Sequence, residues 1–126
     1  MFVHIVLFKV KAQVLNNGFE EFKARIESLR DLQVTKEEVT DLKFGPPVWD
    51  SRSHGFNYGL YAVFRTKEGL VRYKEDSDHK ECVAKVLPLT SAFLRWCFCR
   101  TAMVRTRAIT NAHTDLIAYD FEIQSQ

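Results

Sequence analysis

The chain has 126 residues, of which 46% are hydrophobic and 27% charged, and its formal net charge is +2. A chain of this length buries roughly two-thirds of its unfolded surface, which is enough for one core without disulfides or a metal. The small net charge argues against a nucleic-acid partner and against disorder, and no apolar run reaches the roughly 18 residues that span a bilayer.

The three cysteines are Cys82, Cys97 and Cys99, an odd number without the spacing of a disulfide framework. Cys97 and Cys99 are too close together for a typical zinc pair, and no second pair completes a site. We expect the thiols to be reduced, and the N-terminus does not show the basic region and following apolar segment of a signal peptide. Both features favour an intracellular protein. We therefore expect a cytoplasmic location.

The segment His4 to Lys11 reads His-Ile-Val-Leu-Phe-Lys-Val-Lys and predicts a strand buried on both faces. One face carries His4, Val6, Phe8 and Val10, and the other carries Val3, Ile5 and Leu7. Helices of the same chain can cover one face. The other face needs a second layer or a second copy of the molecule.

Asn17, followed three residues later by Glu20, fits a capping box and predicts the start of an amphipathic helix. Its apolar stripe is typical of plain core and comprises Phe19, Phe22, Ile26 and Leu29. Beyond it, residues 39–44 form a weaker strand candidate, which Gly45-Pro46-Pro47 ends. A polar loop over 48–57 then leads into a strong strand over 56–65.

Thr66 can cap a short helix over 67–74. Asp78 and Glu81 form a second capping box, which places His79 in the first turn of a helix that runs to Pro88. The last strand is expected over 116–123. Its alternation of apolar residues with Asp120 and Glu122 is typical of an edge strand.

The segment 89–115 does not follow this rhythm: it holds four arginines and one acidic residue. We interpret the chain as a single domain over 1–126 with an atypical inserted segment at about 89–115. The insertion is a lid, a partner-binding element or an artefact of the gene model, such as a translated intron.

Without that segment, the order of elements predicts a ferredoxin-like α+β fold, an antiparallel sheet with helices on one face. An apolar open face implies that two copies close face to face. A homodimer therefore follows from the two-sided burial of the first strand.

Several motifs now resemble one family. They are the opening His-Ile-Val-Leu-Phe-Lys-Val-Lys, then Phe-Gly-Pro, Gly-Phe-Asn-Tyr-Gly-Leu-Tyr-Ala-Val-Phe, Leu-Val-Arg-Tyr six residues before His79, and Ile-Ala-Tyr-Asp-Phe-Glu. Together they resemble the stress-responsive dimeric α/β-barrel (Dabb) family over about residues 2–88 and 116–123. That family includes boiling-stable plant stress proteins without an assigned reaction and a plant polyketide cyclase of the olivetolic acid type. The motifs are therefore specific for the fold and not for one function.

The resemblance to the cyclase implies cofactor-free closure of a linear poly-β-ketone thioester by an intramolecular aldol step. Carried over to this sequence, His79 is the base, Tyr73 donates a hydrogen bond to the enolising carbonyl, and His4 lines the pocket. A helix N-terminus disfavours an imidazolium at His79, whereas Asp76 and Asp78 favour one, so the sign of its pKa shift stays open.

The family usually has a proline two residues before this histidine, where the chain has Ser77. The turn is therefore expected to be looser. We expect an apolar cavity for a polyketide-like small molecule between helices and sheet, lined by His4, Val6, Phe8, Phe22, Ile26 and Val83.

Other interpretations remain open. His4 can be a core histidine with a hydrogen-bond partner, Tyr73 and His79 can anchor the two helices through a tyrosine-hydroxyl bond, and His54 and His113 are expected in solvent. The alternative function is a non-enzymatic stress-response or ligand-binding homodimer. A haem- or oxygen-handling relative is a third class.

Overall fold

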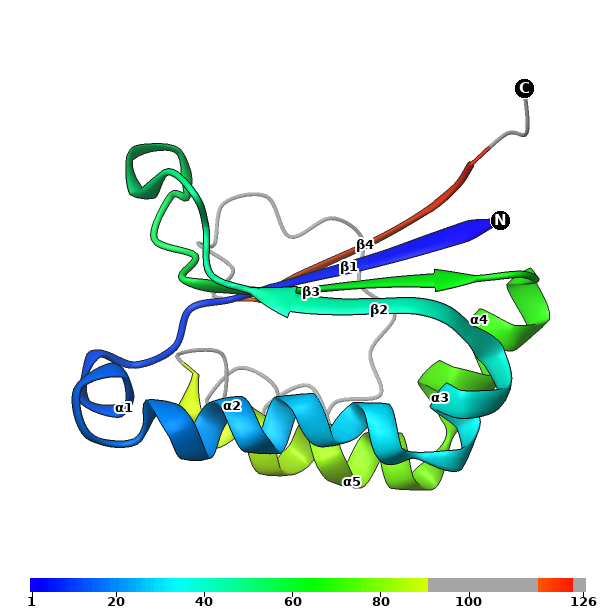
Figure 1. Cartoon of the computed structure of the whole chain (residues 1–126), viewed down its shortest axis with the longest axis horizontal. Helices are drawn as coiled ribbons and strands as arrows, with labels where there is room; N and C mark the ends of the chain where they lie inside the picture. The colour runs from blue at the N-terminus through cyan, green and yellow to red at the C-terminus, as the bar shows by residue number, and fades with distance from the viewer. Residues whose placement is uncertain (91–115, 124–126) are drawn as a thin grey trace, which may run out of the picture.

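The computed structural model describes residues 1–90 and 116–123. In these ranges, the α-helices lie on one side of a four-stranded antiparallel sheet (Figure 1). The strands are β1 (Phe2–Phe8), β2 (Val39–Gly45), β3 (Tyr58–Phe64) and β4 (Leu116–Glu122), in the order β2-β3-β1-β4. The α-helices are α1 (Ala12–Asn17), α2 (Phe19–Glu27), α3 (Gln33–Glu38), α4 (Lys67–Glu75) and α5 (Ser77–Val86), and the short 3-10 helices are η1 (Ser28–Asp31), η2 (Asp50–Arg52) and η3 (Leu87–Leu89). The predicted ferredoxin-like α+β fold is confirmed.

Strand β1 lies inside the sheet, between β3 and β4. Its residues His4, Val6 and Phe8 are buried on the face that meets the helices. On the opposite face Ile5 and Leu7 are only partly buried, whereas Val3, near the start of the strand, is buried. Within the described residues, the helices of this chain thus cover one face of β1.

The core lies between the sheet and the helix layer. Phe22 and Ile26 of α2 and Tyr73 of α4 are essentially inaccessible to solvent and pack in one cluster with Phe8. The Phe8 and Phe22 rings meet edge to face, with 6.3 Å between centroids. The stripe on α2 is therefore core, as its spacing indicated.

The capping box predicted at Asn17 is wrong. Asn17 ends α1, a short helix that the sequence did not indicate, and Gly18 is the N-cap of α2 without a side-chain hydrogen bond. The Gly18 N–H donates to the Val14 carbonyl at 2.8 Å, so this glycine closes one helix and opens the next. Helix α3 was not predicted either.

The cap of α4 is confirmed, because the Thr66 hydroxyl accepts from the Gly69 N–H at 3.0 Å. The capping box predicted from Asp78 is wrong: Asp76 is the N-cap of α5, and its carboxylate accepts from the His79 N–H at 2.8 Å. Helix α5 therefore begins at Ser77. His79 still lies in its first turn, as expected.

Strand β3 begins at Tyr58, after the loop that the sequence indicated. The Asn57 side chain accepts from the Val10 N–H at 2.7 Å and donates to the Val10 carbonyl at 2.9 Å. Asn57 thus fixes the chain just beyond β1.

The inserted segment predicted at 89–115 lies outside the described residues except for Leu89 and Thr90. Thr90 forms an isolated antiparallel bridge with Val10. His113 also lies outside, whereas His54 is exposed, as expected. Within the described ranges, none of the helices has the length and apolar character to cross a membrane.

The two aspartates at the start of α5 give a direct test of the cap. Asp76→Ala is expected to lower the free energy of unfolding by about 1 kcal/mol, because the His79 N–H loses its acceptor. Asp78→Ala is the matched control and is expected to cost less than about 0.5 kcal/mol, since an exposed carboxylate in the first turn contributes mainly through the helix dipole. Urea unfolding measures both. A larger loss for Asp78→Ala would contradict the observed cap.

Candidate functional site

Three side chains form a chain of polar contacts from the helix layer to the edge strand. The Lys74 ammonium on α4 lies 2.8 Å from one oxygen of Asp120 on β4, and His4 Nδ1 lies 2.5 Å from the other oxygen. His4 faces Asp120 directly in the β1–β4 ladder. The sheet register therefore sets this pair.

The charge states of Asp120 and His4 can be assigned. Burial alone would raise the pKa of Asp120, but hydrogen bonds from Lys74 and His4 outweigh it and hold the pKa below its usual value. Burial lowers the pKa of His4 more than Asp120 raises it. At neutral pH, His4 is therefore neutral beside an ionised carboxylate. Only a proton on Nδ1 allows the short hydrogen bond, so His4 keeps its lone pair on Nε2.

Tyr73 and His79 form a second pair on the same side of the sheet. Their ring centroids are 4.2 Å apart, and the Tyr73 ring also meets His4 edge to face at 6.2 Å. The Tyr73 hydroxyl and His79 Nδ1 are both buried, and neither has a hydrogen-bond partner in the described part of the chain. The hydroxyl therefore does not anchor the helices through a hydrogen bond there, unlike one of the interpretations above.

The protonation of this pair follows from burial. Burial raises the pKa of Tyr73 far above its usual value, so the phenol stays protonated and can donate. Burial lowers the pKa of His79 to about 4. Two lysines, and His4 whenever it is protonated, lower this pKa further, and Asp76 opposes them. The pKa shift of His79, whose direction the sequence left open, is thus downward, and His79 is neutral at pH 7.

Local structure brings these groups together. Tyr73 lies near the C-terminal end of α4, and His79 lies in the first turn of α5, with the Asp76 cap between them. The cap hydrogen bond to the His79 backbone forms although Ser77 replaces the family's proline. The backbone of His79 is therefore fixed at this turn.

The predicted lining residues divide into two groups. His4, Tyr73 and His79 lie together, whereas Val6, Phe8, Phe22 and Ile26 are core residues and Val83 is partly buried. Their role as pocket walls stays a prediction. Sequence reasoning missed Asp120, which it interpreted as ordinary edge-strand alternation, and Lys74. Only the pairing of β1 with β4 reveals them.

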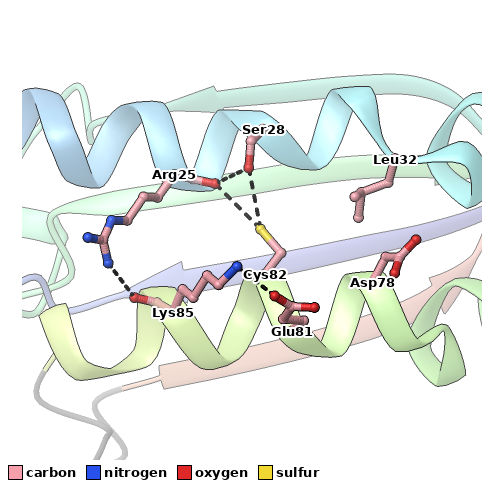
Figure 2. A pocket seen from close by; sticks show the side chains of 7 residues that line it. All are labelled: Arg25, Ser28, Leu32, Asp78, Glu81, Cys82 and Lys85. Carbon is pink, nitrogen blue, oxygen red and sulfur yellow. Dashed lines mark hydrogen bonds and ion pairs between the residues drawn. The ribbon is translucent and has the colours of Figure 1, made fainter.

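A cavity among the described residues lies elsewhere. It has a volume of about 290 Å³ and opens between α2 and α5, with the sheet behind the helices (Figure 2). None of the predicted lining residues contributes to it. Cys82 lies in its wall, where the thiol donates to the Arg25 carbonyl at 3.4 Å and lies 3.6 Å from the Ser28 hydroxyl. Across the described ranges, no group of three or more His, Cys, Asp and Glu side chains is placed to hold a metal ion.

The low pKa of His79 predicts a pH-dependent stability. Between about pH 6.5 and pH 4 the unfolded chain binds a proton at this histidine and the folded chain does not, so the free energy of unfolding falls as the pH falls. After allowance for partial exposure, the loss is on the order of 1 to 2 kcal/mol. In urea unfolding at pH 7, 5.5 and 4, His79→Asn is expected to show a smaller loss than the wild type. The control His54→Asn is expected to keep the wild-type loss. An unchanged loss in His79→Asn would contradict the burial argument.

Comparison with known proteins places the chain in a family. The fold is similar to that of the Arabidopsis thaliana protein At3g17210, with a TM-score of 0.69 and 17% identity, over 99% of this chain and 97% of that chain. It is also similar to a hydroxynitrile lyase from Passiflora edulis, with a TM-score of 0.68 and 13% identity, over 99% and 94% of the two chains. A dimeric ferredoxin-like protein of unknown function from Jannaschia sp. gives a TM-score of 0.62 and 15% identity, over 97% and 98%.

These identities show the fold alone, and no curated protein matches the sequence. The model of the stress responsive A/B barrel domain matches residues 2–98, most of the chain. The protein therefore belongs to the stress responsive A/B barrel domain (Dabb) family.

Proposed function

We propose that this protein binds a carbonyl compound at Tyr73 and His79 and catalyses proton transfer on it without a cofactor. The supporting observation is the pair of buried polar atoms without partners, the Tyr73 hydroxyl and His79 Nδ1. A buried polar group without a hydrogen bond costs about 1 to 3 kcal/mol. A ligand that supplies an acceptor to Tyr73 and a proton to His79 recovers that free energy.

The reaction that fits best is an intramolecular aldol closure of a linear polyketide-type substrate. His79 takes a proton from the carbon next to a carbonyl, and the Tyr73 hydroxyl donates to the resulting enolate oxygen. The enolate carbon then forms a bond with a second carbonyl carbon of the same molecule. The His79 imidazolium returns its proton to the new alkoxide, so every proton is accounted for.

The pKa of about 4 makes His79 a weak base in the free protein, because a general base works best with a pKa near the working pH. An enolate beside the ring raises this pKa, since a negative charge stabilises the imidazolium. The neighbouring His4 contributes a neutral ring, whose proton Asp120 holds on Nδ1. His4 Nε2 is therefore a second acceptor in the same site.

Turnover of a linear poly-β-ketone thioester, followed by the absorbance of the cyclic product, tests this assignment. His79→Asn is expected to lower kcat by about 10² to 10⁴-fold through loss of the base. Tyr73→Phe is expected to lower kcat by roughly 10² to 10³-fold through loss of the donor. Because that hydroxyl has no partner in the described residues, Tyr73→Phe is also expected to keep or raise the free energy of unfolding.

His54→Asn is the matched control, because it makes the same change at an exposed histidine with a φ of 51°, which asparagine tolerates. Its turnover is expected to equal that of the wild type. Equal turnover in His79→Asn, or no turnover by the wild type on chains of several lengths, would exclude the proposed reaction.

The second candidate is a homodimer that binds a ligand without transforming it. The weak basicity of His79 supports it, as does the open face of the sheet, where Ile117, Tyr119 and Phe121 are 39%, 63% and 38% exposed. An exposed apolar face of this kind is typical of an interface. We propose that a second copy covers it, in line with the similar structure that is described as dimeric.

Native mass spectrometry of the purified full-length chain separates the two candidates. Both predict a mass of twice the chain. The ligand-binding candidate predicts a co-purified small molecule that stays unchanged on incubation, and His79→Asn is expected to weaken its retention. A converted molecule would favour the enzyme, and a monomer would contradict the proposed homodimer.

A further inference from the structure

Two neighbouring apolar residues are highly exposed in the loop between β2 and β3. Val48 is 85% exposed and Trp49 is 67% exposed. A tryptophan side chain offers about 150 to 250 Å² of largely apolar surface, so its exposure is costly in a monomer. We call residues 46–57, which carry this pair, the β2–β3 arm.

The arm lies on the open side of the sheet. Residues Val3, Ile5 and Leu7 face that side, and the alternation continues to Lys9. The Lys9 ammonium lies over the ring of Phe56, 4.9 Å from its centroid, and Lys9 Cε lies 3.5 Å from the position of a Cβ at Gly55. Figure 1 shows the same arrangement, since the loop rises from the sheet on the side away from the helices.

The arm has an ordered backbone of its own. The Arg52 N–H donates to the Trp49 carbonyl at 3.0 Å, and the Phe56 N–H donates to the Ser53 carbonyl at 2.9 Å. His54 and Gly55 take positive φ angles of 51° and 84° and reverse the chain between them. An ordered arm loses little conformational entropy on binding, which favours a permanent contact.

The size of the open face gives a reason for the arm. Four strands spaced about 4.8 Å apart and seven residues long at about 3.4 Å each cover a flat area on the order of 500 Å². A typical stable interface buries about 800 Å² on each partner. The side chains that project from the sheet increase the area that it can bury, and Trp49 contributes roughly 200 Å² more.

We propose that the β2–β3 arm clasps the second copy of this chain, with Val48 and Trp49 packed against the partner. The inference rests on the homodimer of the proposed function and adds the residues that secure it. The same open face that needs a cover is the surface that receives the arm. A two-fold axis makes the contact occur twice, because each copy supplies one arm and one face.

Sedimentation equilibrium of the full-length chain tests the proposal. Trp49→Ala is expected to raise the dimer dissociation constant by roughly 30-fold or more, as for a tryptophan at the centre of an interface. The matched control Arg52→Ala changes another exposed residue of the same arm and is expected to shift the constant less than roughly threefold. Equal constants for wild type and Trp49→Ala would overturn the role of the arm and leave the homodimer intact.

Fluorescence gives a second measurement that needs no loss of stability. In a Trp96→Phe background, Trp49 is the only tryptophan. On dilution from dimer to monomer, its emission is expected to move to longer wavelength and its quenching by iodide to increase. If Trp49 in the dimer emits at the wavelength of a solvent-exposed tryptophan, the proposal is overturned. A shift in its emission that occurs only with anionic lipid vesicles would also overturn it. A monomer at every concentration would overturn the homodimer and the arm together. If Trp96→Phe does not fold, sedimentation of Trp49→Ala decides.

Discussion

His4 and Asp120 face one another across the antiparallel ladder of β1 and β4, and both faces of the sheet depend on this register. A slip of one residue would turn His4 and Phe8 toward the open side and bring Ile5 and Leu7 against the helices. The hydrogen bond from His4 to Asp120 stabilises the correct register, since a misplaced carboxylate would lose two partners, His4 and Lys74. One polar pair at an edge strand thus connects the core, the candidate site and the open face.

The site differs from the core in how its polar groups are satisfied. His4 is buried with a partner, whereas buried Tyr73 and partly buried His79 each have one buried polar atom without a partner in the described residues. Burial also sets their protonation: a protonated phenol beside a neutral imidazole is a donor next to an acceptor. Such a pair is costly in an empty protein and becomes favourable when a carbonyl compound supplies the missing contacts.

Much of the fold could be predicted from local patterns. The alternation in the strands, the stripe of Phe22 and Ile26, and the Thr66 cap are all short-range signals, and the structure confirms each of them. The cap at Asp76 was misplaced by two residues, because Asp78 fits the same motif. The role of Asp120 could not be predicted, since it arises from a partner 116 residues away, and sequence alternation does not give the strand order.

The central claim is that Tyr73 and His79 together form a binding site for a carbonyl group. The most direct test is nitrogen-15 NMR of the histidine rings while a stable β-diketone is added to the labelled protein. The account predicts that the His79 ring nitrogens shift at neutral pH, that those of exposed His54 do not, and that the His79 shift disappears in Tyr73→Phe. A His79 spectrum that does not respond to the diketone, in a protein that remains folded, would contradict the account.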